Sequence, residues 1–287
     1  MFPYFLSQVN MKNYILLIHC QDEPGLVYRV TKAVFENGCN IIRNDEFVDK
    51  TTGHFFMRTE FAGDGDAAAI KKNLDVSLTD ANIRLVEKKK KDIVILATKE
   101  HHCLGDLILR QHYGQLEANI KAVISNHDVL MSLAEKFNIP FHFISHEGLS
   151  REDHEDRIAN AIDSYAPDYI ILAKYMRILS GSFVARYENK MINIHHSFLP
   201  AFVGANPYQK AHDRGVKIIG ATAHFVTENL DEGPIIVQEV IPVNHRYETE
   251  DMVQAGKDVE KLALANALKL ALEDRIFVIN NRTIIFN

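Results

Sequence analysis

The chain has 287 residues, which is enough for about two domains of ordinary size. Its 47% hydrophobic and 24% charged residues are typical of a globular protein, and a net charge of −6 excludes the extended basic surface that binds nucleic acid. No apolar run approaches the ~20 residues of a membrane span, and the first ten residues lack the features of a signal peptide. Cys20, Cys39 and Cys103 are widely spaced, which predicts free thiols in a reducing cytoplasm.

Residues 12–88 show the pattern of one small α/β unit, preceded by a tail over 1–11. The apolar run 14–19 predicts a strand, and turn residues then lead into a helix whose apolar stripe begins at Leu26. The remaining pattern predicts strands over 40–48, 53–61 and 82–86 and a second helix over 67–74. This βαββαβ order is that of a ferredoxin-like domain.

Four consecutive lysines at 88–91 interrupt this pattern. Such a run can form a nucleic-acid patch, but a solvated linker fits the acidic chain better, so we place a linker at 89–91. In residues 92–287, short apolar runs alternate with helix-like segments, which predicts a doubly wound, mostly parallel sheet in an α/β domain. The expected strands span 93–97, 118–125, 141–145, 169–173, 191–194, 221–226 and 235–241. A long helix N-capped by Thr249 and a terminal hairpin over 276–286 complete the pattern.

The segment from Met191 to Gln238 carries the most chemistry. Asn193 and His195 are two residues apart, so on a strand their side chains leave the same face. Asp231 follows in an Asp-Glu-Gly-Pro turn. Each residue alone has a purely structural explanation, as a turn former or a packed histidine. Together, an amide donor, an imidazole and a carboxylate are the groups that polarise a carbonyl and move its protons, so we interpret them as catalytic.

These motifs carry a family resemblance. Residues 92–287 resemble the formyltransferase fold that uses 10-formyltetrahydrofolate, and residues 14–88 resemble an ACT domain, a small-molecule-sensing module. In that order, the two resemble the formyltetrahydrofolate deformylase family. The matching motifs are Asn193-Ile194-His195, Ser197-x-Leu199-Pro200, His224, Asp231-x-Gly233-Pro234, Met176-Arg177-Ile178-Leu179-Ser180 and Asp22-Glu23-Pro24-Gly25-Leu26.

The resemblance implies roles for the catalytic residues. Asn193 would donate a hydrogen bond to the formyl oxygen, and His195 would stabilise the oxyanion and pass on a proton. Asp231 would hold His195 and orient or deprotonate water. His224 and His196 are expected to support them, His224 beside Asp231 and His196 near the water, although a packed histidine and a tolerated substitution are the plainer explanations.

Two binding sites also follow from the resemblance. The folate would contact Met176, Arg177, Ile178 and Leu179. Asp22, Gly25 and Asn40 would capture an amino-acid effector, glycine or methionine, in a homo-oligomer that is a dimer or a tetramer. We expect no cofactor and no metal, because no second cluster completes the ligand set of His101-His102-Cys103.

The acceptor of the formyl group is inferred from what the chain lacks. Nucleotide-using relatives have a Gly-rich phosphate cradle after the first catalytic strand, whereas Lys99–Gly105 has one late glycine and the acidic Glu100. The loop Phe202-Val203-Gly204 offers no arginine. Water is therefore the expected acceptor, giving formate and tetrahydrofolate, with formate used for purine synthesis and the one-carbon folate pools kept in balance. The alternatives are formyl transfer to an amine and an amino-acid-binding regulator with an idle catalytic domain.

Overall fold

The computed structural model describes residues 12–200 and 207–286. The predicted tail and the loop Phe202–Gly204 lie outside these residues. The described chain divides into two compact units that meet in sequence between Lys89 and Lys90. Across the described ranges, no helix has the length and apolar character needed to cross a membrane.

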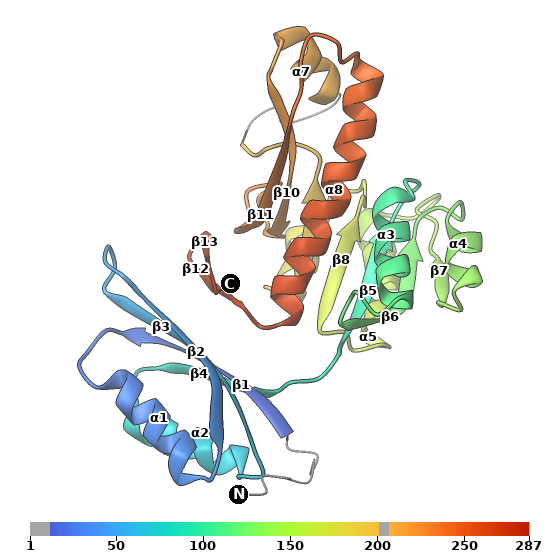
Figure 1. The fold of residues 1–287 in the computed structure, drawn as a ribbon. Helices are drawn as coiled ribbons and strands as arrows, with labels where there is room; N and C mark the ends of the chain where they lie inside the picture. Colours follow the sequence, from blue (N-terminus) through green and yellow to red (C-terminus); the bar gives the residue numbers. More distant parts are fainter. Residues whose placement is uncertain (1–11, 201–206, 287) are drawn as a thin grey trace, which may run out of the picture. The chain divides into compact units, whose positions relative to one another are not determined.

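The first unit is a four-stranded antiparallel sheet with two helices on one face (Figure 1). Its elements are β1 (Lys12–Gln21), α1 (Leu26–Glu36), β2 (Asn40–Asp49), β3 (His54–Gly63), α2 (Ala67–Ser77) and β4 (Asn82–Glu87). The strand order is β2-β3-β1-β4. The apolar stripe of α1, which includes Leu26 and Val30, packs against β1 and β3 and forms the core. The expected βαββαβ order is confirmed.

The second unit contains a seven-stranded sheet, a separate two-stranded hairpin and six helices among the described residues. Its elements are β5 (Lys91–Ala97), α3 (His102–His112), β6 (Ala118–Ser125), α4 (Met131–Lys136), β7 (Phe141–Phe143), α5 (Arg151–Asp163), β8 (Tyr169–Ala173), α6 (Gly181–Arg186), β9 (Met191–His195), α7 (Pro207–Arg214), β10 (Ile218–Phe225), β11 (Ile235–Pro242), α8 (Thr249–Leu272), β12 (Ile276–Ile279) and β13 (Arg282–Ile285).

The large sheet has the order β11-β10-β9-β8-β5-β6-β7. Its five strands from β9 to β7 are parallel, and β10 and β11 are antiparallel, so the mostly parallel sheet is confirmed. The chain winds outward from β5 to β7 and then returns through β8 to β9. The topological switch therefore lies between β5 and β8, where α/β sheets place their ligand sites at the carboxyl ends of the strands.

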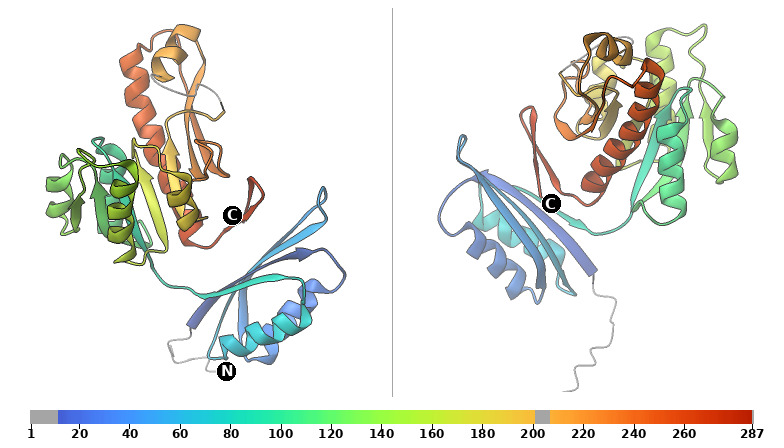
Figure 2. Two further views of the ribbon diagram at one scale, coloured as in Figure 1. Left: turned by 180° about the vertical axis from the view of Figure 1, so that it is seen from behind. Right: turned by 45° about the horizontal axis from the view of Figure 1, so that its top comes forward.

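Successive residues of β5 supply the cores on the two faces of this sheet. Ile93 and Ile95 belong to a core built with α3 and α8, whereas Val94 and Leu96 belong to one built with α5 and α6. Figure 1 shows α3 and α8 side by side on one face, and Figure 2 shows the other face from behind. Apolar strands buried on both faces are what a parallel sheet requires.

Several boundaries differ from the sequence prediction by a few residues, and at two of them the structure shows a physical reason. Strand β5 begins at Lys91, which pairs with Ala118, so the predicted linker is one residue too long. The Lys91 ammonium lies 2.6 Å from the buried Asp274 carboxylate, which compensates its charge within the sheet. Helix α8 is N-capped by Glu248 instead of Thr249, because the Glu248 amide donates to the Asp251 carboxylate at 3.0 Å.

Candidate active site

The catalytic residues come from a strand end and a turn that lie opposite each other. Strand β10 runs antiparallel to β9 with His224 opposite Asn193 and Thr222 opposite His195, so these side chains share one face. The turn after β10 then brings Asp231 back to them. The structure therefore brings together Asn193, His195, His224 and Asp231, which line one cavity of about 950 Å³.

Asp231 holds the imidazole of His195. Its Oδ1 lies 3.3 Å from Nδ1 of His195 and 3.8 Å from Nε2 of His224. Burial opposes ionisation of this carboxyl group, but its hydrogen bond to His195 and the nearby histidines hold its pKa below the usual value. Asp231 is thus a carboxylate at neutral pH. The backbone of Asp231 has a φ of 58°, a left-handed conformation that aspartate adopts more readily than most residues.

His224 braces Asn193 more directly than it braces Asp231. Nδ1 of His224 donates to the carbonyl of Phe225 at 2.9 Å, which leaves Nε2 as an acceptor. Nδ2 of Asn193 lies 3.3 Å from this Nε2 and donates to it. Burial lowers the pKa of His224, in agreement with a neutral ring. The amide of Asn193 is therefore oriented, with a second N–H available for a carbonyl oxygen.

His195 and His196 stack with their ring centroids 4.8 Å apart. The Nε2 atoms of both rings are buried and have no hydrogen-bond partner among the described residues. Both residues line the cavity. Two ring nitrogens are thus available to the reacting groups.

The predicted folate segment forms another wall of the cavity. Met176 and Ile178 expose more than half of their side chains, while the amide of Met176 donates to Oγ1 of Thr98 and the carbonyl of Ile178 accepts from Arg151. The structure describes no backbone hydrogen bond to Arg177 or Leu179, so their peptide groups are available for a planar polar ring. Such an apolar cavity with a few fixed polar groups is typical of a small-molecule site.

The remaining wall carries buried charges that the sequence interpretation missed. Lys174, just after β8, lies 3.2 Å from Oε2 of Glu260 on α8, and the same oxygen lies 2.7 Å from Nε2 of His102. Tyr208 donates to the other carboxylate oxygen at 3.0 Å. A lysine at the end of an apolar strand and a glutamate within the apolar stripe of α8 are the sequence signals that point to this pair.

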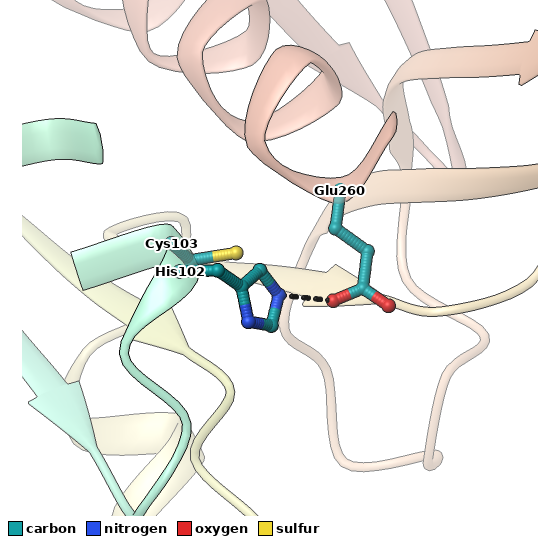
Figure 3. Close-up of side chains that lie close together, drawn as sticks. All are labelled: His102, Cys103 and Glu260. Atoms are coloured by element: carbon teal, nitrogen blue, oxygen red, sulfur yellow. Dashed lines mark hydrogen bonds and ion pairs between the residues drawn. The ribbon is translucent and has the colours of Figure 1, made fainter. Parts of the chain in front are cut away.

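His102, Cys103 and Glu260 lie close enough to hold a metal ion, with their ligand atoms within 4.8 Å of one another (Figure 3). Helix α8 thus supplies a third group, Glu260, that the sequence interpretation of His101–Cys103 did not anticipate, and the expectation that no metal binds stays a prediction. Lys174 contacts the same carboxylate oxygen as His102, and burial raises the pKa of the Cys103 thiol, so that it stays neutral. These features are those of an ion-pair network.

The effector residues are not all brought together within one chain. Asp22 follows β1, and Gly25 starts α1 with a φ of 88°. Asn40 pairs with Ala62, at the end of the sheet where β1 begins. Because β1 and β2 run parallel, Asn40 is separated from Asp22 by the length of a ten-residue strand, about 30 Å. The expectation that Asn40 lies near Asp22 is wrong for a single chain.

Known families match this architecture. Residues 91–268 match the sequence profile of the Formyl transferase family, and residues 14–85 match that of the ACT domain. Fold and site thus define a formyl transferase unit that follows an ACT domain. The chain is 56% identical over 272 residues to the formyltetrahydrofolate deformylase of Haemophilus influenzae, covering 94% of this chain and 98% of that protein.

Solved structures of the same families are also similar to this chain. A formyltetrahydrofolate deformylase from Pseudomonas syringae pv. tomato matches with a TM-score of 0.92 and 38% identity, over 99% of this chain and 96% of that one. Glycinamide ribonucleotide transformylase 1 from Symbiobacterium toebii matches with a TM-score of 0.66 and 28% identity, over 69% of this chain and 95% of that one. The chain belongs to the formyltetrahydrofolate deformylase family.

Proposed function

We propose that this protein hydrolyses 10-formyltetrahydrofolate to formate and tetrahydrofolate. The observation that carries the proposal is the convergence of Asn193, His195 and Asp231 on one cavity beside the segment Met176–Leu179. The extensive similarity to formyltetrahydrofolate deformylases supports it. By this proposal the formate serves purine synthesis and the reaction balances the one-carbon folate pools. The three buried free cysteines favour a reducing cytoplasm as its location.

Three side chains of the cavity can together carry out the hydrolysis. Asn193 donates to the formyl oxygen, and Asp231 takes a proton from water as the water oxygen bonds to the formyl carbon. His195 enters the reaction as an imidazolium that donates through Nδ1 to Asp231, and it stabilises the oxyanion through Nε2. The C–N bond then breaks, its electron pair stays on nitrogen, and His195 protonates that nitrogen. The proton on Asp231 returns to His195, and formic acid ionises after release.

No metal has a role in this proposal, because the Lys174 ammonium and the hydrogen bond from Nε2 of His102 already occupy the Glu260 carboxylate. The test is to incubate the purified protein with 10-formyltetrahydrofolate and no acceptor, and to measure formate and tetrahydrofolate. Equimolar products at a rate unchanged by a chelator support the proposal. The absence of formate, or its loss on chelation, contradicts it.

Formyl transfer to an amine is the second candidate, since the Symbiobacterium toebii transformylase shares the fold. The start of α3 counts against a phosphorylated acceptor, because Glu100 lies 3.5 Å from Nδ1 of His102 and places a carboxylate there. The matching test adds glycinamide ribonucleotide to the same assay. A formylated product would favour transfer. An idle catalytic unit, the third alternative, predicts no turnover with either acceptor.

We also propose that the first unit binds an amino acid, glycine or methionine, at Asp22 and Gly25, in a homo-oligomer that is a dimer or a tetramer. The ACT family match supports sensing. Strand β2 is an edge of its sheet and exposes Ile42 and Phe47, which favours pairing between copies.

The effector is tested by measuring formate release with each amino acid in wild type and Asp22→Ala. An effect that persists in the variant contradicts the proposed site. Sedimentation of wild type and Ile42→Lys tests the interface, and a monomeric wild type contradicts it.

A further inference from the structure

The left-handed backbone of Lys174 marks an unusual position. Its φ is 63°, in a region that costs a residue with a Cβ roughly 1–2 kcal/mol. The side chain is nevertheless 5% exposed, and its ammonium group lies between Glu260 and His196. A strained backbone conformation persists only where the surrounding structure enforces it, and such positions are common at functional sites.

The contact between Lys174 and His196 defines the protonation of that ring. Nζ of Lys174 lies 3.4 Å from Nδ1 of His196. An ammonium group has donors and no acceptor, so Nδ1 must be the acceptor and the ring proton must reside on Nε2. This Nε2 is the buried atom that has no partner in the described part of the chain.

We infer that Lys174 and Glu260 are positioning residues for the hydrolysis: they hold His196 as the Nε2–H tautomer, so that its ring donates a hydrogen bond to an oxygen of the tetrahedral centre. This inference rests on the proposed function. Glu260 holds Lys174, and His102 and Tyr208 hold Glu260. His196 is thereby a donor beside His195, and it is not a general base, because its acceptor nitrogen is occupied.

The charges around the ring agree with this geometry. Burial, followed by the positive charge of Lys174, lowers the pKa of His196 to about 4, so the ring is neutral at pH 7. A neutral N–H donor aimed at developing negative charge contributes to catalysis without any proton transfer. If Glu260 were instead a metal ligand, replacing Lys174 would leave kcat unchanged.

The tautomer is tested directly in the intact protein by long-range ¹H–¹⁵N correlation spectra of ¹⁵N-histidine-labelled protein at pH 7. His196→Gln assigns the signal by its disappearance. The expected spectrum shows a protonated Nε2 and a bare Nδ1. An Nδ1–H tautomer or an imidazolium overturns the inference, whether or not the variants below fold.

Kinetics of formate release test the role in the chemical step. We expect His196→Leu to lower kcat about 100-fold, as the loss of one oxyanion donor does, with KM within roughly threefold. His196→Gln, which retains an N–H donor, recovers most of this rate. We expect Lys174→Met to lower kcat about 10-fold, because nothing then keeps the ring proton of His196 on Nε2. Lys174→Arg retains a donor to Nδ1 and should recover the rate.

Lys91→Met is the matched control, since it removes a buried ion pair with Asp274 far from the cavity residues in the sheet, and we expect it to leave kcat unchanged. Unchanged kcat in Lys174→Met and His196→Leu, or equal losses in Lys91→Met, overturns the inference. If the wild type releases no formate, the proposed function fails, and the tautomer measurement still decides the geometry.

Discussion

Replacing Asp231 with asparagine gives the sharpest test of the hydrolytic site. The φ of 58° at this position suits asparagine as well as aspartate, so the turn should be retained. An alanine there would mix backbone strain with the loss of charge. The Asp231→Asn change therefore removes a carboxylate with little change in shape.

The size of the effect follows from the contact with His195. At 3.3 Å, and with an effective dielectric constant of ~20 for partly buried groups, a carboxylate and an imidazolium attract each other by about 5 kcal/mol. Both side chains are largely buried, at 14% and 8% exposure, so screening by solvent is limited. Without the carboxylate, forming the imidazolium that protonates the leaving nitrogen costs up to this much more, which corresponds to a decrease in kcat of up to several thousandfold, in the range of ~10³–10⁴.

The assay is steady-state formate release from 10-formyltetrahydrofolate without an acceptor. We expect KM to change little, because Asp231 contacts His195 and not the folate segment. Asp75→Asn is the control, since Asp75 forms an exposed helical pair with Lys71 and should not affect turnover. A kcat for Asp231→Asn within about tenfold of wild type would refute the mechanism.

Three further predictions concern the network around Glu260. Glu260→Gln should lower the free energy of unfolding by about 3 kcal/mol or more, because it leaves Lys174 buried without its partner, and Lys174→Met/Glu260→Gln should recover part of that loss in urea titrations. The ion pair and its hydrogen bonds hold the pKa of Glu260 at about 2 despite burial, so its contribution is complete above pH 4.5 and is lost as the pH falls towards 2. The stability difference between wild type and Glu260→Gln should shrink in that window. A Cβ on Gly256 would lie 2.0 Å from Oη of Tyr208, so Gly256→Ala should displace Tyr208 and lower kcat with folate affinity retained. A full wild-type rate would contradict this last prediction.

The sequence allowed the layers and the pair Asn193 and His195 to be predicted because both depend on short-range patterns. Alternating apolar runs and helices define a parallel sheet, and the spacing of Asn193 and His195 places them on one face of β9. The position of Asp231 follows from a motif rather than from periodicity, since only the antiparallel return of β10 brings it back to His195. Family spacing supplied that information.

The network was missed because it depends on distant parts of the chain. His102 and Glu260 are 158 residues apart and meet only when α8 lies against α3. The place of Glu260 on the apolar stripe of α8 is a local signal of burial, but no local pattern identifies the residues that it meets. The distance between Asn40 and Asp22 within one chain was missed for a related reason: the parallel direction of β2 relative to β1 places Asn40 at the opposite end of the sheet from Asp22. The role of Asn40 at an interface between copies stays a prediction.

The late position of Glu260 in the chain also affects the order in which the site forms during synthesis. The carboxylate that holds Lys174 lies on α8, which begins at Thr249 and is among the last elements to leave the ribosome. Before α8 docks, Lys174 has no buried counter-charge, and the pocket that would surround it stays open to water. A nascent chain can therefore form the strand that carries Asn193 and His195 well before it can turn over folate. We therefore expect the charged network around Lys174 to be complete only after the C-terminal helix has docked.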